Sequence, residues 1–370
     1  MTPVTTAGKS MFMAMELSKK NWKLAFSNGE RIRHINVAGG DPEGLRAAIE
    51  RSREKLGLAG DCAVYACYEA GRDGFWIHHC LEGMGVKNAV VDPASIEINR
   101  RRRRVKTDRL DAESLVRMLM RYVLHNEKTA WRVVVVPSEE EEDERRLHRE
   151  HKRLGCERTG HLNRIRSLLI LHGVHSRKIA GVDNSKLRDW RGRPLPVFLQ
   201  EELLREQARL GVLDEQIKVL GARLQEGVKN PKSAVEKKSA KLTKLKGIGV
   251  QGSSVLSREF FGWRKFRNRR EVGSLAGLTG TAYASGEKTV EQGISKAGNK
   301  RVRYTMIEMA WMWIRYQPGS ELTKWFMRRF GGGGKRMRRV GIVALARKLL
   351  VALWKYVEFD EIPSGAVMSA

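Results

Sequence analysis

The sequence predicts an α/β region at the amino terminus followed by all-α regions. Apolar residues first alternate along short segments up to residue 91. The composition then changes to Glu, Arg, Leu and Gln between Ser138 and Lys237, and from Leu242 helical spacing alternates with glycine turns. We therefore expect three regions, residues 1–128, 129–236 and 237–370.

The first region has the element order strand, strand, strand, helix, strand, helix, strand. The alternating or apolar segments that predict strands are residues 11–17, 22–26, 31–37, 62–68 and 88–91, and helical spacing covers 42–56 and 75–84. The Asn28-Gly29 pair is a strong hairpin signal, so the sheet should begin antiparallel. A helix over residues 108–122 completes the order that a ribonuclease-H-like fold uses.

The middle region, residues 129–236, has no strand pattern and should form two long helices separated at residues 181–184 and 194–196. Apolar residues in the second helix follow a four-three spacing that only Glu206 interrupts, which is typical of a coiled-coil seam. The seam residues are Leu203, Leu210, Leu213, Ile217, Leu220 and Leu224. Two interpretations stay open: the seam packs within its own domain, or it joins two protomers.

The third region, residues 237–370, is predicted to be mainly helical, with helices at 301–316 and 340–357 and a glycine hinge at 331–334. It begins with a helix, a turn at Gly247-Ile248-Gly249 and a second helix. This turn resembles a helix-hairpin-helix, in which the N–H groups of Gly247 and Gly249 could hold a DNA phosphate. A tight turn between two helices is an equally good interpretation.

The charge of the chain identifies its class of partner. The 370 residues contain 70 Lys and Arg against 42 Asp and Glu, a formal charge of +28, which indicates a polyanion such as nucleic acid. No apolar run is long enough to cross a membrane, since Arg347 and Lys348 interrupt the most apolar stretch. Four cysteines and no signal-peptide pattern lead us to expect a reducing cytoplasm.

Four acidic residues occupy positions that converge in the predicted topology. Glu16 ends the first strand, Glu69 ends the fourth, and Asp108 and Asp111 begin the last helix of the region. Residues three apart on a helix have Cβ atoms about 5–6 Å from each other. Carboxylates gathered in this way suit Mg²⁺ or Mn²⁺, although each residue alone could be a helix cap or a surface charge.

Seven motifs cover nearly the whole chain. They are ELSKKNWKLAF from Glu16, CYEAGRDGFWIHHCLEGMG from Cys67, VKTDRLDAESL from Val105, ERTGHLNRIRSLLILHGV from Glu157, LKGIGVQGSSVL from Leu245, LAGLTGTAYASG from Leu275 and GISKAGNKRVR from Gly293. In these motifs the chain resembles the DEDD transposases of the IS-one-ten (Piv/MooV) insertion-sequence family. That family pairs a RuvC-like domain with a serine-bearing transposase domain. It usually has Asp at the position of Glu16, and the longer Glu would displace a metal by about 1 Å unless the strand adjusts.

The resemblance implies an activity and its residues. Glu16, Glu69, Asp108 and Asp111 would bind Mg²⁺ or Mn²⁺, and Ser285 would be the nucleophile that forms a covalent phosphoserine with DNA. The site would combine the carboxylates of one protomer with the serine of another, which requires a homo-oligomer, a dimer or a tetramer. A bridge RNA would guide the choice of donor and target DNA. Without the family, Ser285-Gly286 would be interpreted as a plain turn.

Clusters of basic residues are the predicted nucleic-acid contacts. Residues 296–350 contain 14 Lys and Arg and two acidic residues, which is far more positive charge than solubility needs. A second cluster lies beside the acidic residues. The predicted contacts are Arg100, Arg101, Arg102, Arg103, Arg104, Lys106, Lys296, Lys300, Arg301, Arg303, Lys335, Arg336, Arg338 and Arg339.

Two other functions remain open at the level of sequence. The chain could be a RuvC-like metal nuclease that hydrolyses branched DNA, with Ser285 only structural. It could also be a non-catalytic nucleic-acid-binding relative of a transposase, for which Glu16 is the best argument. A covalent protein–DNA adduct would separate the recombinase from both.

Overall fold

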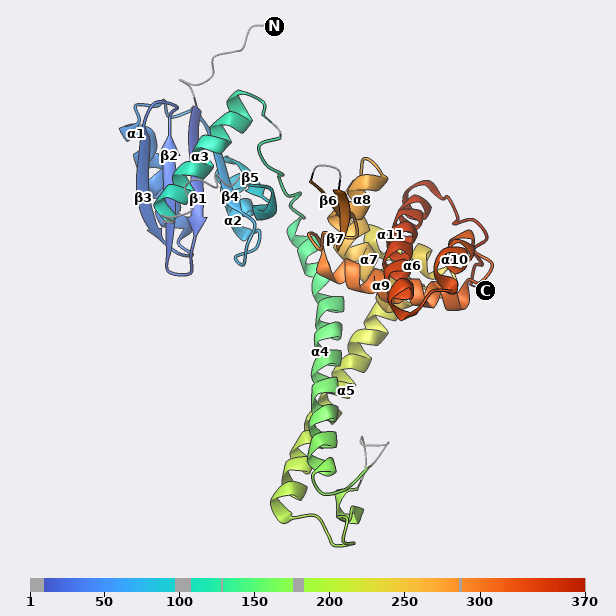
Figure 1. Ribbon diagram of the computed structural model, residues 1–370. Helices are drawn as coiled ribbons and strands as arrows, with labels where there is room; N and C mark the ends of the chain where they lie inside the picture. Colours follow the sequence, from blue (N-terminus) through green and yellow to red (C-terminus); the bar gives the residue numbers. More distant parts are fainter. Residues whose placement is uncertain (1–9, 97–107, 128, 176–182, 286–287, 370) are drawn as a thin grey trace. The chain divides into compact units, whose positions relative to one another are not determined.

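The computed structural model describes residues 10–96, 108–127, 129–175, 183–285 and 288–369 (Figure 1). The chain divides into two compact units, Met1–Val136 and Pro137–Ala370. The first unit contains the sheet and its helices. The second contains both the predicted middle region and the predicted C-terminal region.

Strands in the described part of the first unit form one sheet. They are β1 (Ser10–Leu17), β2 (Asn21–Ser27), β3 (Ile32–Ala38), β4 (Ala63–Glu69) and β5 (Lys87–Val91). Their order across the sheet is β3-β2-β1-β4-β5. The first three strands are antiparallel neighbours, whereas β4 and β5 run parallel to β1. The predicted element order and the antiparallel start of the sheet are confirmed.

Helices cover both faces of this sheet because side chains alternate between the faces along each strand. Met11, Met13 and Met15 of β1 are buried against residues of α1 (Pro42–Lys55) and α2 (Trp76–Gly83). Phe12 and Ala14 are buried on the opposite face against α3 (Asp108–Leu124), which Figure 1 shows lying across the strands. A short 3₁₀ helix, η2 (Pro93–Ser95), follows β5.

The first unit continues past residue 128. The Asp92 N–H donates to the Arg132 carbonyl at 2.9 Å, and the Val134 N–H donates to the Val90 carbonyl at 2.7 Å. Trp131 is buried in the core on the α3 face. These contacts attach residues 129–136 to the edge of the sheet, so the unit ends at Val136.

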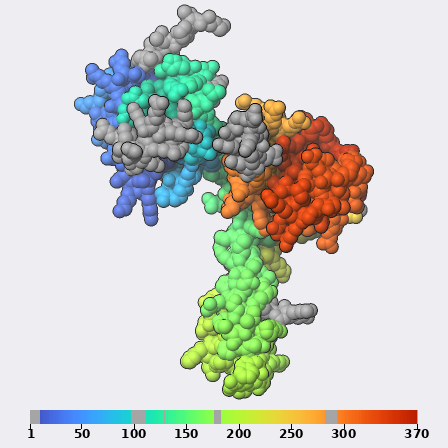
Figure 2. Space-filling model, viewed as in Figure 1, coloured from blue at the N-terminus to red at the C-terminus, as the bar shows by residue number. Residues whose placement is uncertain are grey.

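A long helical hairpin begins the second unit. Figures 1 and 2 show α4 (Glu139–Ile170) and α5 (Val197–Lys229) lying side by side and projecting from the C-terminal helices. Leu203 and Leu210 of α5 are buried with Ile165 and Leu169 of α4. Leu203 and Leu210 therefore pack within their own chain, and the joining of two protomers along the hairpin stays a prediction. A hydrophobic stripe does not itself specify which helix covers it.

Polar pairs join the two helices of the hairpin. His161 of α4 bonds the buried Glu206 carboxylate at 2.6 Å, and Arg164 donates to Glu202 at 2.7 Å. Glu206 interrupts the leucine spacing, and its carboxylate is contacted by both His161 and Arg209. A short 3₁₀ helix, η4 (Asn184–Lys186), lies in the connection between α4 and α5.

The rest of the second unit is mainly helical, as predicted. Its elements are α6 (Ala234–Thr243), α7 (Val250–Leu256), the π-helix η5 (Ser257–Phe261), α8 (Arg269–Leu275), β6 (Gly280–Ser285), β7 (Lys288–Ile294), α9 (Lys300–Tyr316), α10 (Glu321–Phe326), the π-helix η6 (Met327–Gly331) and α11 (Lys335–Phe359). The sequence analysis missed the β6–β7 pair, and α11 begins at Lys335 rather than at the predicted Val340. None of the described helices is both long and apolar enough to cross a membrane.

Candidate active site

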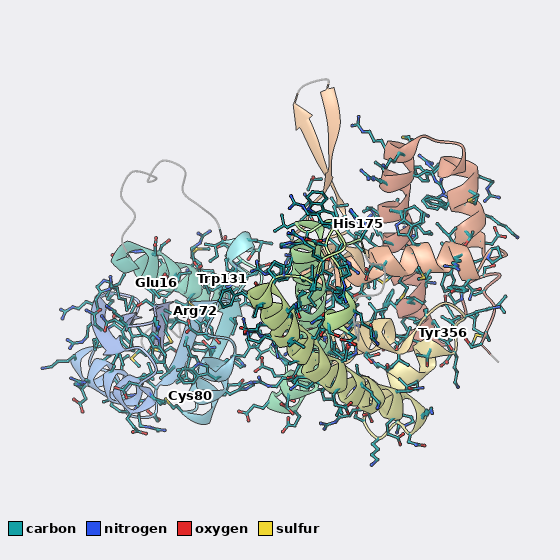
Figure 3. All side chains as sticks on the ribbon, turned by 90° about the horizontal axis from the view of Figure 1, so that it is seen from below. Glu16, Arg72, Cys80, Trp131, His175 and Tyr356 are labelled. Atoms are coloured by element: carbon teal, nitrogen blue, oxygen red, sulfur yellow. The ribbon has the colours of Figure 1, made fainter. Side chains whose placement is uncertain are left out.

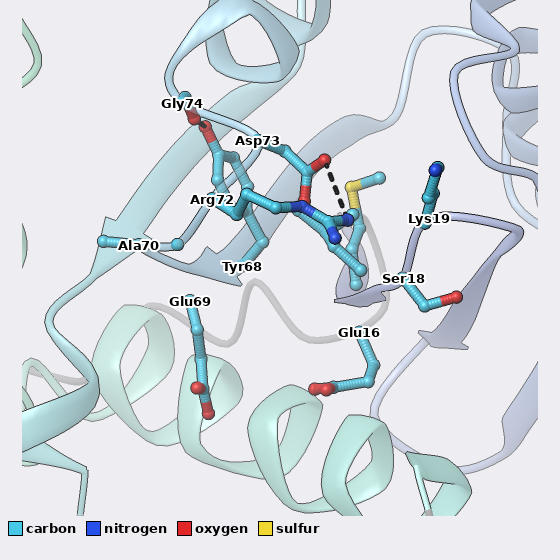
Figure 4. Close-up of a pocket in the computed structure, with 12 residues that line it drawn as sticks. Glu16, Ser18, Lys19, Tyr68, Glu69, Ala70, Arg72, Asp73 and Gly74 are labelled. Carbon is cyan, nitrogen blue, oxygen red and sulfur yellow. Dashed lines mark hydrogen bonds and ion pairs between the residues drawn. The ribbon is translucent and has the colours of Figure 1, made fainter. Parts of the chain in front are cut away.

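A cavity of about 410 Å³ lies where β1 and β4 end. Glu16 and Glu69 line it together with Ser18, Lys19 and the loop at residues 70–74. Both glutamates are half-buried and point to the same side of the sheet, toward helix α3 (Figure 4). The structure therefore brings together two of the four carboxylates that the sequence predicted.

Strand register explains why Glu16 and Glu69 meet. Met15 of β1 pairs with Tyr68 of the parallel strand β4, so the two glutamates follow the last registered pair. Each is two residues beyond a side chain in the α3-facing core, Ala14 on β1 and Cys67 on β4. Because the side-chain period is two, both glutamates belong to the same face.

The predicted aspartates lie on the helix that covers this face. Asp108 is the first residue of α3, but its side chain lies outside the described part of the chain. Asp111 is half-buried in the first turn of α3 and is not among the residues that line the cavity. Within the described residues, no group of three or more His, Cys, Asp or Glu has the geometry of a metal site.

Cationic side chains border the same cavity. Lys19 and Arg72 are exposed at its edge, and Arg72 Nη2 lies 3.6 Å from Asp73 Oδ1. Figure 3 shows Glu16 and Arg72 near each other in the first unit. Lys19 and Arg72 were not predicted from the sequence, although the GRDG loop after Glu69 was a signal that could have indicated Arg72. Figure 4 shows the two carboxylates directed toward α3 and Arg72 on the other side of the strand ends, so cations and carboxylates flank the same end of the sheet.

The thiol beneath the glutamates is chemically inert. Cys67 is fully buried, and its Sγ lies 3.9 Å from the Leu115 carbonyl. Burial, helped by the nearby Glu69 carboxylate, raises the pKa of the Cys67 thiol well above its ordinary range. The group therefore stays protonated at neutral pH and belongs to the core rather than to the chemistry.

Ser285 is the last residue of β6 and pairs with Lys288 of β7. The two connecting residues, Gly286 and Glu287, and the side chain of Ser285 lie outside the described part of the chain. At the other end of the hairpin, the Ser295 N–H donates to the Thr279 carbonyl at 2.8 Å, and Arg303 Nη1 donates to the Lys296 carbonyl at 2.9 Å. The base of the hairpin is thus firmly attached to the start of α9.

The predicted basic contacts have different environments. Lys296, Lys300 and Arg301 are exposed around the start of α9. The guanidinium of Arg303 instead bonds backbone carbonyls, which is a structural role. Exposed residues of the first turns of α11 are Lys335, Arg336, Arg338 and Arg339. The residues outside the described part are Arg100, Arg101, Arg102, Arg103, Arg104 and Lys106.

The predicted Gly-Ile-Gly turn joins α6 and α7. Gly247 has φ +91°, and a Cβ there would lie 3.0 Å from Tyr316 Cβ, so the turn needs glycine. Gly249 caps α7 without a side-chain bond. These observations explain the turn as packing, and its contact with a phosphate stays a prediction.

A buried ion network was missed by the sequence analysis. Glu259, on the π-helix η5, is 1% exposed and accepts hydrogen bonds from Arg149 Nε at 2.6 Å and from Asn299 Nδ2 at 3.2 Å. His148 Nε2 lies 3.0 Å from the same carboxylate. Burial alone would raise the pKa of Glu259, but the bonds from His148 and Arg149 hold it well below its ordinary range. A lone Glu in SREFFGW reads as a surface charge, so sequence alone offered no signal.

Comparison with known proteins identifies the family. Residues 239–324 match the family described as "Transposase IS116/IS110/IS902 family". A chain of Sinorhizobium fredii (strain NBRC 101917 / NGR234) named "Putative transposase y4rJ" is 41% identical over 378 residues, covering 97% of this chain and 94% of that protein. The chain belongs to the IS116/IS110/IS902 transposase family.

Two more members show how far the likeness extends. The "Putative transposase y4qE" of the same strain is 28% identical over 84% of this chain and 73% of its own length. The "Transposase for insertion sequence element IS1328" of Yersinia enterocolitica is 26% identical over 67% of this chain and 71% of its own length. The matched region 239–324 of this transposase-family chain contains η5, the β6–β7 hairpin and all of α9.

Proposed function

We propose that this chain is an insertion-sequence transposase that cuts and rejoins DNA, with a RuvC-like, ribonuclease-H-like first unit. The observation that carries the proposal is the pair Glu16 and Glu69 at the ends of adjacent parallel strands, with both side chains directed toward α3 (Figure 4). Membership of the transposase family supports it independently.

The donors around the cavity fit a divalent cation. Glu16 and Glu69 supply hard oxygen ligands, and Asp111 and Asp108 begin the helix that covers the same face. When bound, Mg²⁺ or Mn²⁺ would supply Lewis-acid stabilisation of charge on a phosphodiester. Lys19 and Arg72 are placed to hold phosphate oxygens at the rim.

Ser285 is proposed as the nucleophile. Its position at the end of β6, next to a two-residue connection, puts it at the tip of a hairpin. The serine oxygen would bond to phosphorus as a DNA ester bond breaks, giving a covalent phosphoserine and a free DNA hydroxyl. A serine hydroxyl needs activation, which the carboxylate centre of another protomer would provide.

The formal charge of +28 supports a polyanionic partner besides DNA, and we propose a bridge RNA. The protein would then contact phosphates and the shape of the RNA, while base pairing selects the DNA sequence. Sequencing the RNA that co-purifies with the chain tests this part. A defined structured RNA is expected, and random cellular RNA would contradict it.

A denaturing gel tests the proposed chemistry. Incubation with element-end DNA and Mg²⁺ should give a covalent protein–DNA adduct that Ser285→Ala abolishes while folding and affinity persist. Cut DNA without an adduct would indicate a hydrolytic nuclease, and neither product would indicate a binding protein. Co-assembly of Ser285→Ala with Asp108→Ala should restore part of the activity if two protomers share the site.

A further inference from the structure

The segment Trp263–Arg270 connects the π-helix η5 to helix α8. It contains Arg264, Lys265, Arg267, Arg269 and Arg270 and no acidic residue. Lys265, Arg267, Arg269 and Arg270 are all exposed. The predicted contacts from residue 296 onward did not include this segment, although it is one of the densest concentrations of positive charge in the chain.

Aromatic side chains anchor the segment at two places. The Phe266 ring lies 4.7 Å from the Phe260 ring and packs against the main core of the second unit. The guanidinium of Arg264 lies 4.3 Å from the centroid of the Trp263 ring, and the guanidinium of Arg145, on α4, lies 5.2 Å from it. The basic side chains therefore project from a backbone whose position is set by the core.

Hydrogen bonds order the second half of the segment. Asn268 Oδ1 accepts from the N–H groups of Arg270 and Glu271, which caps α8. The Glu271 carboxylate in turn accepts from the Arg267 N–H at 2.8 Å. Because the backbone is already ordered, a ligand that binds here avoids much of the entropy cost of arranging its contacts.

Cationic side chains are crowded beneath this surface too, where Arg145 pairs with Glu142 at 3.5 Å and Arg258 with Glu236 at 4.0 Å. One buried carboxylate, that of Glu259, is shared by Arg149, His148 and, at 3.9 Å, Arg301. Among the described residues, no hydrogen-bond acceptor reaches Arg264 Nε or Arg258 Nε. Burial, and then the charge of Arg145, lowers the pKa of Arg264 to about 10. An anion bound at the surface would relieve this mutual repulsion.

Helix geometry argues against a purely structural role for the exposed arginines. Arg269 and Arg270 occupy the first turn of α8, where the helix dipole disfavours cations. No side-chain hydrogen bond or ion pair is described for either of them or for Arg267 within the part of the chain that the structure covers. All three side chains are exposed, so a phosphate can reach them.

We propose that the segment Trp263–Arg270, braced by Phe266 and Arg145, is a binding surface for the phosphodiester backbone of a nucleic acid. The inference rests on the proposed function, since it assumes a nucleic-acid substrate or guide. The segment leads through α8 to Leu275, whose carbonyl accepts from the Asn299 N–H at the base of the β6–β7 hairpin. A backbone held here is therefore held beside the hairpin that carries Ser285.

The test is a triple variant, Arg267→Gln/Arg269→Gln/Arg270→Gln, in the full chain. Its affinity for a labelled random-sequence DNA duplex and for single-stranded RNA is measured against salt concentration, with EDTA present. For the nucleic acid that uses this surface, the slope of the logarithm of the binding constant against the logarithm of salt concentration should become shallower. The expected change is about 0.9 per lost contact for the duplex and about 0.7 for the single strand. The DNA and RNA arms show which nucleic acid uses the surface.

The matched control is Arg205→Gln/Lys218→Gln/Arg223→Gln, which removes the same charge from the exposed face of α5. It should change neither slope. The first triple variant should also unfold at an unchanged or higher temperature, because unfavourable charge leaves the first turn of α8. Unchanged slopes in the first variant for both nucleic acids, or equal losses in the control, would overturn the inference. EDTA makes the result independent of whether the proposed cleavage chemistry is correct.

Discussion

Glu69 in the first unit and Glu259 in the second are the same residue type in opposite settings. Glu69 is half-buried beside a cavity, where cations and a second carboxylate are neighbours. Glu259 is sealed from solvent and bonded by an arginine, a histidine and an asparagine. The comparison teaches that access, rather than charge, separates a carboxylate suited to chemistry from one that stabilises the fold.

Glu69→Gln is expected to have the largest effect. Gln keeps the size of the side chain but removes the charge, so DNA cleavage should fall on the order of 10³-fold, while the free energy of unfolding changes by less than about 1 kcal/mol. Cleavage kinetics and calorimetric titration with Mg²⁺ measure the loss. Glu30→Gln, on an exposed turn of the same sheet, is the control and should behave as the unchanged protein. Normal cleavage by Glu69→Gln would remove Glu69 from the site.

Glu259→Gln should show the reverse pattern. Breaking one partner of a buried ion pair leaves Arg149 without its anion and costs about 3–5 kcal/mol of stability. Urea unfolding, with hydrogen exchange of α4 and α9 to locate the change, measures it. Comparable stability of Glu259→Gln and Glu69→Gln would show that the contrast between the two glutamates is mistaken.

Acid should weaken the second unit through the same network. Burial lowers the pKa of His148 below its usual 6.5 despite the bond to Glu259, and the pKa of Glu259 is also held low. Folding lowers both pKa values. The contribution of each group to stability is therefore complete at pH values above its pKa in the unfolded chain, and it is lost as pH falls through its pKa in the folded chain. Unfolding free energies measured from pH 7 downward should begin to fall below pH 6.5 and fall further below 4.5. In Glu259→Gln the step below 4.5 should become smaller, because Glu206 and other carboxylates with lowered pKa values still contribute to it.

The setting of Glu206 is intermediate between those of Glu69 and Glu259, and its substitution is expected to have the smallest effect. Burial would raise the pKa of this carboxyl, but the hydrogen bond from His161 and the charges of His161 and Arg209 lower it. Glu206→Gln should cost about 1–2 kcal/mol in urea unfolding, because Gln keeps the packing and one hydrogen bond. Glu215→Gln, on an exposed position of the same helix, should change little. If Glu206→Gln lost as much unfolding free energy as Glu259→Gln, the setting of a carboxylate would not determine how much its substitution costs.

Strands β1 to β5 could be predicted because alternation has a period of two, and the register then placed Glu16 beside Glu69. The β6–β7 pair was not predicted, because GTAYAS and KTVEQGI contain few large apolar residues and lie among glycines. Glu259 was equally hidden: its partners His148 and Arg149 are more than a hundred residues away in sequence. Contacts between residues so far apart in the sequence produce no pattern among neighbouring residues.

The sequence by itself determined that residues 197–229 are a helix with a leucine stripe, and that the chain carries a large positive charge. Only the tertiary structure decided that α4 of the same chain covers that stripe, that Arg145 lies over the Trp263 ring, and that Arg149 bonds Glu259. The physical reason is that periodicity reports which face of an element is apolar. Hydrophobic burial is non-directional, so the partner of that face is chosen by chain connectivity and by polar pairs such as His161 and Glu206.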